Sequence, residues 1–216
     1  MKLYYSHIAP NPTKIRLYLA EKAIGGAQIP MTEVLIDLRA GEQNSPDHTV
    51  RNYFQSVPVL ELDDGSYLIE SLPAMEYLEE LYPMPSLVGR TAIERARIRQ
   101  LERIAETRVL NPLARFVHST RSPLGLHPSP EIAESALKTL TKGLSFFDQL
   151  LTDGRQFVTG EQPSIADCTL AAGLNFGRYG GFECDPSLAN LERWDRSYRA
   201  RPHVREALAS VSIWAT

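Results

Sequence analysis

Two prolines flank an asparagine at the start of the first predicted helix, within SHIAPNPTKIRLYLAEK (residues 6–22). Asn11 is a plausible N-cap, and Pro12 suits the first helical turn, where a missing N–H costs nothing. The same corner would direct the positive end of the helix dipole and a side-chain amide at one point. A thiol bound there would have its pKa lowered, so the corner is a candidate thiolate site.

Two further residue pairs suit the main chain and the head group of a ligand. The proline of Val57-Pro58 cannot donate to a strand ladder, so it marks either a plain strand start or a cis bond. With a cis bond, Val57 would offer its N–H and C=O to an extended ligand. At Glu70-Ser71, Ser71 is either a simple helix cap or part of a carboxylate site at a helix start, where Glu70 would balance an ammonium group.

Strands and helices that must position these residues alternate in the first third of the chain. Periodicity predicts a strand at 2–5, then a helix whose apolar residues are Ile15, Leu19, Ala20 and Ile24 and which ends at a Gly-Gly pair. A second strand follows at 32–38, then a polar segment over residues 39–56 that is irregular or weakly helical. A hairpin turning at Asp64-Gly65 and a helix from Ser71 to about residue 82 complete a βαβ-ββα order.

Beyond Pro83 the strand signals nearly vanish. Helical periodicity covers residues 90–118, 130–152, 164–179 and 188–210. In the third of these segments, Ser164 and Asp167 form a capping box. The fold class is therefore α+β followed by all-α: a small domain over residues 1–82, a linker over 83–89, and an all-helical domain over 90–216.

Composition excludes several function classes. The net charge is −3, and the arginines of residues 90–108 alternate with glutamates along one solvated helix face, so we expect no nucleic-acid partner. No long apolar run or secretory h-region is present, so we expect a cytoplasmic protein without a membrane partner. The five histidines are scattered and Cys168 and Cys184 stand outside any CxxC, so we expect no metal.

The motifs above, in this order, resemble those of the cytosolic glutathione transferases, bacterial type. The resemblance spans the whole chain and is carried by APNPTKIRLYLAEK, SVPVLELDDG, LIESLPAMEYLEELYP, FVTGEQPSIADCTLAAGLNF and LERWDRSYRARPHV. It implies that a thioredoxin-like N-terminal domain binds glutathione, that the helical domain supplies a pocket for a hydrophobic electrophile, and that the protein is a homodimer. Ser164 and Asp167 would then govern folding rather than catalysis.

The resemblance also implies roles for particular residues. Val57 would pair with the cysteinyl backbone, Pro58 would be cis, and Glu70 and Ser71 would hold the γ-glutamyl head. The expected glutathione site comprises Ala9, Asn11, Ser56, Val57, Pro58, Glu70 and Ser71. Because Ser56 is shorter than its usual counterpart, Arg39, Gln43 or His48 are candidates to hold the glycyl carboxylate, although His48 equally suits a surface position. The expected electrophile pocket comprises His7, Ile8, Thr107, Leu110 and Phe176, with Tyr179 nearby; these residues equally suit helix-bundle core.

One departure concerns catalysis. Many members carry serine or cysteine just before the proline of the corner, but this chain has Ala9, which disfavours cysteine-type redox chemistry. The corner is closest to a subgroup in which an asparagine follows the proline, so Asn11 is the first candidate to stabilise the thiolate and Ser6 the second. Tyr4 and Tyr5 are the other hydroxyl groups within reach.

Conjugation of glutathione to hydrophobic electrophiles is therefore the leading functional hypothesis, with peroxide reduction as a side activity. Two alternatives stay open. One is a glutathione-dependent disulfide reductase or isomerase on the same fold. The other is a non-catalytic module that binds glutathione or a protein partner.

Overall fold

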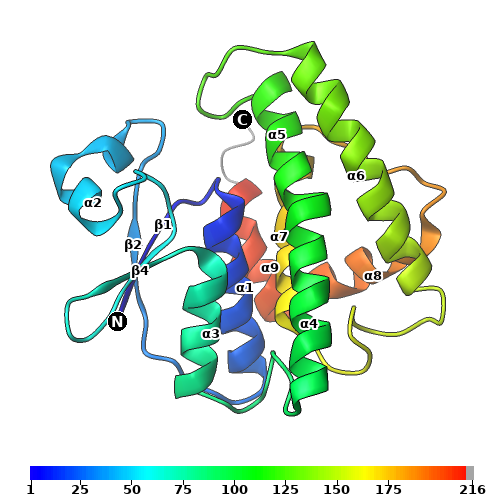
Figure 1. Cartoon of the computed structure of the whole chain (residues 1–216), viewed down its shortest axis with the longest axis horizontal. Coiled ribbons are helices and arrows are strands. Elements are labelled where there is room, and N and C mark those ends of the chain that lie inside the picture. The colour runs from blue at the N-terminus through cyan, green and yellow to red at the C-terminus, as the bar shows by residue number, and fades with distance from the viewer. Residues whose placement is uncertain (213–216) are drawn as a thin grey trace.

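The computed structural model describes the backbone of residues 1–212 and the side chains of residues 1–208 (Figure 1). Its N-terminal unit holds a four-stranded sheet of order β2-β1-β3-β4, in which β1 runs parallel to β2 and antiparallel to β3. The strands are β1 (Lys2–Tyr5), β2 (Thr32–Leu35), β3 (Val59–Glu61) and β4 (Tyr67–Ile69). This unit is the expected thioredoxin-like domain.

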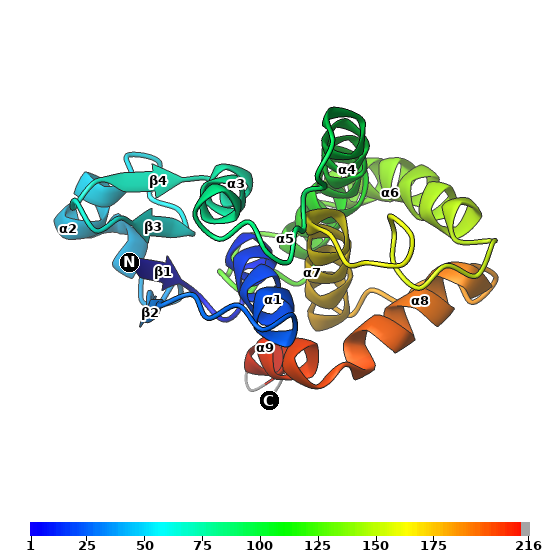
Figure 2. The same ribbon diagram turned by 90° about the horizontal axis from the view of Figure 1, so that it is seen from below.

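Helices cover both faces of this sheet. α1 (Pro10–Ile24) and α3 (Ser71–Leu81) lie on the face toward the helical domain, and α2 (Pro46–Arg51) lies on the other side (Figure 2). The segment expected to be irregular or weakly helical holds two short helices, the 3₁₀ turn η1 (Glu42–Asn44) and α2. Ser45 caps α2 by accepting a hydrogen bond from the His48 N–H. The β3–β4 hairpin turns at Asp64-Gly65 as predicted, with Gly65 at φ 82°.

The second unit is helical throughout its regular elements. It consists of α4 (Ala92–Ala105), the π-helical turn η2 (Glu106–Leu110), α5 (Asn111–Thr120), α6 (Pro130–Leu150), α7 (Ile165–Tyr179), α8 (Ala189–Ala200) and α9 (Pro202–Ser212). The predicted helix over 188–210 is broken at Arg201, whose extended backbone precedes Pro202. None of the helices within residues 1–212 combines the length and apolar composition of a membrane span.

α1 lies between the sheet and the helical domain, and packs against α3, α7 and α9 (Figure 2). The predicted apolar stripe of α1 was therefore incomplete: Leu17 and Tyr18 are also fully buried, while Ile24 is 41% exposed. Lys14, Glu21 and Lys22 are buried as well, because α1 has packing partners on opposite sides. One hydrophobic core runs through both units, from Leu3 and Leu60 in the sheet to Trp194 in α8.

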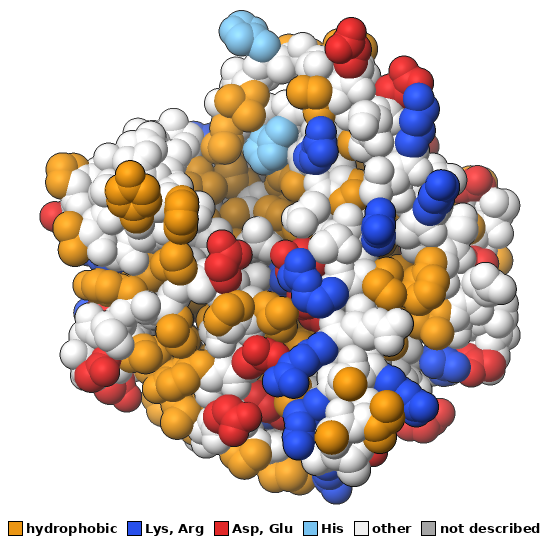
Figure 3. Space-filling view, in the orientation of Figure 1, with side chains coloured by type: hydrophobic (Ala, Val, Ile, Leu, Met, Phe, Trp, Pro, Cys, Tyr) orange, Lys and Arg blue, Asp and Glu red, His pale blue; other side chains and the backbone are white. Residues whose placement is uncertain are grey.

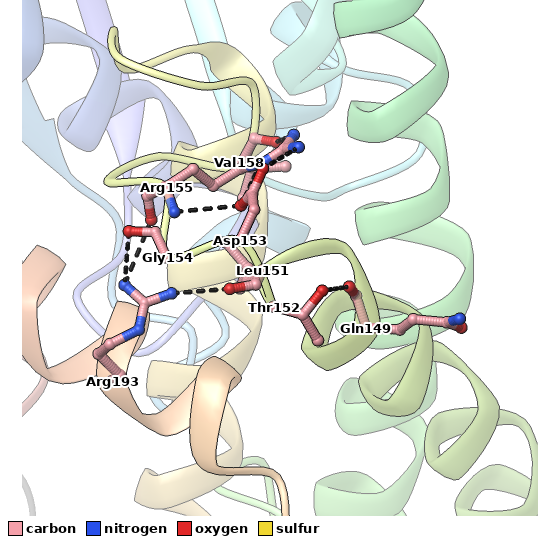
Figure 4. A network of polar contacts seen from close by, with 8 residues as sticks. All are labelled: Gln149, Leu151, Thr152, Asp153, Gly154, Arg155, Val158 and Arg193. Atoms are coloured by element: carbon pink, nitrogen blue, oxygen red, sulfur yellow. Dashed lines mark hydrogen bonds and ion pairs between the residues drawn. The ribbon is translucent and has the colours of Figure 1, made fainter.

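The loop between α6 and α7 is held against α8 by a network of polar contacts (Figure 4). The Arg193 guanidinium donates to the carbonyl of Leu151 at 2.9 Å and to those of Gly154 and Arg155 at 3.3 Å. Asp153 and Arg155 form an ion pair within the same loop. The loop is followed by Ser164, where the predicted capping box is present.

Candidate functional site

The sheet brings the three predicted ligand-binding segments to one edge. β1 and β4 both run antiparallel to β3, so their carboxyl ends and the start of β3 lie together. Tyr4 pairs with Val59, and Val59 pairs with Ile69. Ser6 follows β1, Val57 precedes β3 and Ser71 follows β4, so these three residues lie at the same edge of the sheet, where neighbouring strands are about 4.8 Å apart.

The first segment is the corner between β1 and α1. The helix N-cap predicted at this corner was wrong, and so was the one predicted at the start of α3. α1 begins at Pro10 with Ala9 as N-cap, so Asn11 is its second residue, because proline at the first position already has helical φ. Similarly, Glu70 is the N-cap of α3, with φ 74°, and Ser71 is its first helical residue.

The two prolines leave the start of α1 with few donors. Pro10 and Pro12 have no N–H, so among the first three helical positions only Asn11 carries a backbone donor. Thr13 is already engaged, because its hydroxyl donates to the Ala9 carbonyl at 3.0 Å. The positive end of the α1 dipole therefore offers an anion the N–H of Asn11, and the half-buried side-chain amide of Asn11 lies in the same turn.

Val57 is the second segment. Its bond to Pro58 is cis, and no hydrogen bond to its backbone N–H or C=O is found among residues 1–212. The preceding Ser56 carbonyl is held by the Nε2–H of His48 at 3.0 Å and the side-chain amide of Asn52 at 2.9 Å. The expectation of a surface position for His48 was wrong: His48 is fully buried and supports the Ser56-Val57 backbone from behind.

Two hollows adjoin the corner. The larger, of about 330 Å³ and open to solvent, is lined by Ser6, His7, Ile8, Leu35, Ile36, Asp37 and Arg39. The smaller, of about 140 Å³, is lined by Ile8, Ala9, Pro10, Thr13, Ala172, Asn175 and Phe176. In the space-filling view the surface is hollowed between the α2 side of the molecule and α5, and hydrophobic side chains form much of the floor (Figure 3).

The predicted electrophile residues separate into two groups. His7, Ile8 and Phe176 line the hollows, where we expected them. Leu110 is instead a core residue, 1% exposed, whose backbone packs so closely on α7 that a Cβ at Gly173 would lie 2.9 Å from it. The Thr107 hydroxyl donates to the Arg103 carbonyl at 2.7 Å, along its own helix. Neither Leu110 nor Thr107 lines either hollow.

No motif in the sequence assigned a role to His118. Its ring lies 5.7 Å from the Phe176 ring, centroid to centroid, and its Nδ1 lies 3.0 Å from the Ser122 hydroxyl. Burial lowers the pKa of His118, and burial with the nearby Arg16 lowers the pKa of His7. Both imidazoles are therefore neutral at neutral pH, and each has a nitrogen that can accept a proton.

The chain's own thiols lie elsewhere. Cys168 is buried in α7, with its sulfur 3.8 Å from the Tyr198 hydroxyl, and burial raises the pKa of its thiol. Cys184 follows α7 and is half-buried. The side chains described here include no group of His, Cys, Asp and Glu that could hold a metal ion. Neither thiol is among the residues that line the two hollows.

Comparison with known proteins shows which family the chain resembles along most of its length. Residues 1–80 match the model of the glutathione S-transferase N-terminal domain, and residues 99–209 match that of the C-terminal domain. Glutathione S-transferase 2 of Saccharomyces cerevisiae is 32% identical over 96% of this chain and 89% of its own length. A maleylacetoacetate isomerase of Pseudomonas aeruginosa is 26% identical over 95% of this chain and 88% of its own. The crystal structure of Gtt2 from Saccharomyces cerevisiae superposes with a TM-score of 0.86 at 31% identity, over 96% of this chain and 100% of that one.

Proposed function

The chain belongs to the glutathione S-transferase family, and from that premise we propose that it conjugates glutathione to hydrophobic electrophiles in the cytoplasm, as a detoxifying enzyme. The observation that carries the proposal is the meeting of Ser6, Val57 and Ser71 at one edge of the sheet, where β1 and β4 end and β3 begins. An extended tripeptide, about 10 Å long, spans the two strand spacings between β1 and β4. Its cysteinyl part would pair with Val57, its γ-glutamyl head would lie at Glu70 and the start of α3, and its sulfur would reach the corner.

In the proposed reaction the glutathione sulfur is the nucleophile. The thiol loses its proton, the thiolate forms a bond to an electrophilic carbon in the adjoining hollows, and the leaving group departs with the bonding electrons. The chain orients the two reactants and stabilises S⁻ through the α1 dipole and the amide of Asn11, with the Ser6 hydroxyl as the second donor. The thiol proton passes to solvent water, because the larger hollow at the corner is open to solvent. We therefore assign the chain to the subgroup in which an asparagine follows the proline of the corner.

The ultraviolet difference spectrum of bound glutathione, titrated against pH, tests the proposal. We expect a thiolate band whose midpoint lies well below that of free thiol, together with conjugation of a chloronitrobenzene acceptor. Asn11→Ala should raise the pKa of the bound thiol by about one unit, because a hydrogen bond to a charged group contributes about 1.5–3 kcal/mol. Ser6→Ala is the matched comparison and should have the smaller effect.

Either of two results would remove this mechanism. If folded Asn11→Ala keeps the wild-type titration, Asn11 does not stabilise the thiolate. If wild-type protein binds glutathione tightly by calorimetry without any shift in thiol pKa, the chain is a glutathione-binding module without activation. A disulfide reductase is disfavoured, because Ala9 occupies the position of the cysteine that such chemistry uses and Cys168 is buried.

A glutathione-dependent isomerase is the second candidate, because the relatives include the maleylacetoacetate isomerase of Pseudomonas aeruginosa. In an isomerase, the thiolate adds to an activated double bond and is released again after rotation, so glutathione is not consumed. Assay of maleylacetoacetate with catalytic and with stoichiometric glutathione separates the two activities. Turnover that continues with a small amount of glutathione would favour the isomerase.

We also propose that two copies associate through an apolar cluster made of Val50, Tyr53 and Phe54, which are 78%, 83% and 70% exposed. The Tyr53 and Phe54 rings pack edge to face 5.8 Å apart, as a pair. Beside the sheet, Glu76 of α3 forms an ion pair with Arg99 of α4 within one chain, so the proposed association rests on the apolar cluster.

Light scattering should therefore give twice the chain mass. Tyr53→Ser with Phe54→Ser should weaken the association at least 100-fold, as expected for the loss of buried aromatic hot spots. Phe146→Ser, which changes another exposed aromatic on α6, is the control and should remain dimeric. A wild-type protein with the mass of one chain would overturn this interface.

A further inference from the structure

A guanidinium joins the two units on the electrophile side of the corner. Arg39, in the loop after β2, donates from Nη2 to the hydroxyl of Tyr179 at 2.8 Å. Tyr179 is the last residue of α7, and its ring stacks on Phe176 with centroids 6.3 Å apart and planes 15° apart. Phe176 in turn lines the smaller hollow together with Ala9. Arg39 is thus connected through two aromatic rings to the place where the sulfur is expected.

The position of Arg39 separates it from the proposed glutathione backbone site. β2 lies on one side of β1, whereas β3 and β4, which carry Val57 and Glu70 at their ends, lie on the other. Arg39 lines the larger hollow with His7 and Ile8, and Leu35 and Ile36 form the rest of its apolar wall. The hollow therefore combines an apolar wall with the guanidinium of Arg39 and with the carboxylate of Asp37, one oxygen of which is held by backbone N–H groups of its own loop.

The loop that carries Arg39 is ordered by its own hydrogen bonds. One oxygen of Asp37 accepts from the backbone N–H of Arg39 at 2.9 Å and of Ala40 at 3.1 Å. The Asp37 N–H donates to Glu42 at 2.7 Å, and the Glu42 N–H donates to the Asp37 carbonyl at 3.1 Å. The loop thus presents Arg39 toward α7 in a defined position.

We propose that Arg39 and Tyr179 form an anion subsite that selects electrophiles carrying a carboxylate; this inference rests on the proposed function. A phenol oxygen that accepts from arginine retains its own O–H donor, so the pair offers a carboxylate two converging donors. The planar guanidinium suits a carboxylate better than an ammonium does. The apolar walls of the larger hollow would hold the body of the acceptor, and the carboxylate would point away from the sulfur.

Two acceptors with the same reactive carbon test the subsite: 4-chloro-3-nitrobenzoate and its methyl ester. Arg39→Met should lower kcat/KM for the benzoate about 10- to 50-fold and change that for the ester less than about twofold. Tyr179→Phe should lower the benzoate value about threefold, and Arg39→Lys should recover part of the loss. Arg97→Met, at an exposed arginine of α4, is the control and should behave as wild type.

Two outcomes would overturn the subsite. Equal losses for benzoate and ester would mean that Arg39 only supports the structure of the hollow. An unchanged benzoate-to-ester ratio with weaker glutathione binding by calorimetry would mean that Arg39 holds the glycyl carboxylate instead. Melting curves of each variant establish that the fold is retained, which we expect because Arg39 is exposed.

Failure of the proposed function is distinguishable from failure of the subsite. Dissociation constants of the two S-aryl glutathione adducts, prepared chemically, can be measured without any turnover. Tighter binding of the carboxylate adduct that is lost in Arg39→Met supports the subsite even if the protein catalyses no conjugation. Equal binding of both adducts to wild-type protein overturns the subsite even if conjugation is efficient.

Discussion

Replacing Lys14 with methionine is expected to lower the free energy of unfolding by about 3–5 kcal/mol, because the change leaves a buried carboxylate without its cation. Lys14 lies one turn after Asn11 on α1, and its side chain is fully buried. Its Nζ lies 3.0 Å from Glu102 and 2.6 Å from Glu106. Methionine preserves the volume and removes the charge, so the loss reports on the ion pairs.

The surroundings of Lys14 explain why the effect should be large. Glu102 is fully buried in α4 and also accepts a hydrogen bond from the Thr169 hydroxyl of α7 at 3.1 Å. Glu106 begins the π-helical turn η2 and is shared with Arg103 at 3.1 Å. The cluster therefore connects α1, which carries the thiolate corner, with α4 and α7, which border the electrophile side. We expect a higher KM for glutathione to accompany the loss of stability.

The loss of stability in Lys14→Met should depend on pH in a defined direction. Burial raises the pKa of Glu102, and removal of Lys14 raises it further, because the cation is the main group that favours the ionised form. A carboxylate with a folded-state pKa above its unfolded value favours folding most at low pH, and this contribution is lost as pH rises through the folded pKa. The difference in stability between wild type and Lys14→Met should therefore be smallest in acid and grow toward neutral pH.

Urea unfolding at several pH values measures these differences. Lys138→Met is the matched control, because Lys138 forms an exposed i,i+4 pair with Glu134 that contributes at most about 0.5 kcal/mol. Lys14→Met combined with Glu102→Gln should recover part of the loss, since the remaining amide carries no charge. A loss below about 1 kcal/mol, or one that does not change with pH, would contradict the role assigned to Lys14.

The order of elements and the sheet edge were predictable, because they depend on local signals. Asp64-Gly65 predicts its turn from the chemistry of two residues, and Ser164 with Asp167 predicts a helix start. The two helix caps failed for an equally local reason. Asn11 and Ser71 are good capping residues, but neither is the N-cap of its helix. Proline at position 10 starts α1 early, so Ala9 is its N-cap, two residues before Asn11. Glu70, with its positive φ, is the N-cap of α3, one residue before Ser71.

The parts of the site that depend on distant partners could not be predicted. Lys14 resembles a solvent-facing residue until α4 is placed beside it, and Glu102 belongs to the segment whose arginines and glutamates were expected on a solvated helix face. His48 resembles a surface residue because nothing local shows that the Ser56 carbonyl needs a donor. The bond between Arg39 and Tyr179 joins residues 140 positions apart. Periodicity identifies a buried face of a helix, but it does not identify the partner.

The second large effect is expected at Asp167, whose replacement by alanine should lower the free energy of unfolding by about 4 kcal/mol. Asp167 is fully buried and accepts from the Val158 N–H at 2.7 Å, the Ser164 N–H and hydroxyl at 2.9 Å, and the Trp194 indole at 3.1 Å. Burial raises the pKa of Asp167 to about 6, so the carboxylate is ionised at neutral pH and accepts from all of these donors. Each buried donor left without an acceptor costs about 1–3 kcal/mol.

The same carboxylate connects three separate parts of the helical domain: the loop at Val158, the start of α7 at Ser164, and α8 through Trp194. Loss of Asp167 should therefore slow folding as well as weaken the native state, while the thiol pKa of bound glutathione in the folded fraction stays unchanged. Asp153→Asn is the control on the same loop, because Asp153 is exposed and its ion pair with Arg155 lies within that loop, so little change in stability is expected. Wild-type stability for Asp167→Ala would mean that water replaces the carboxylate at these donors. A changed thiol pKa would mean that Asp167 acts on the site through α7, whose far end carries Phe176 and Tyr179.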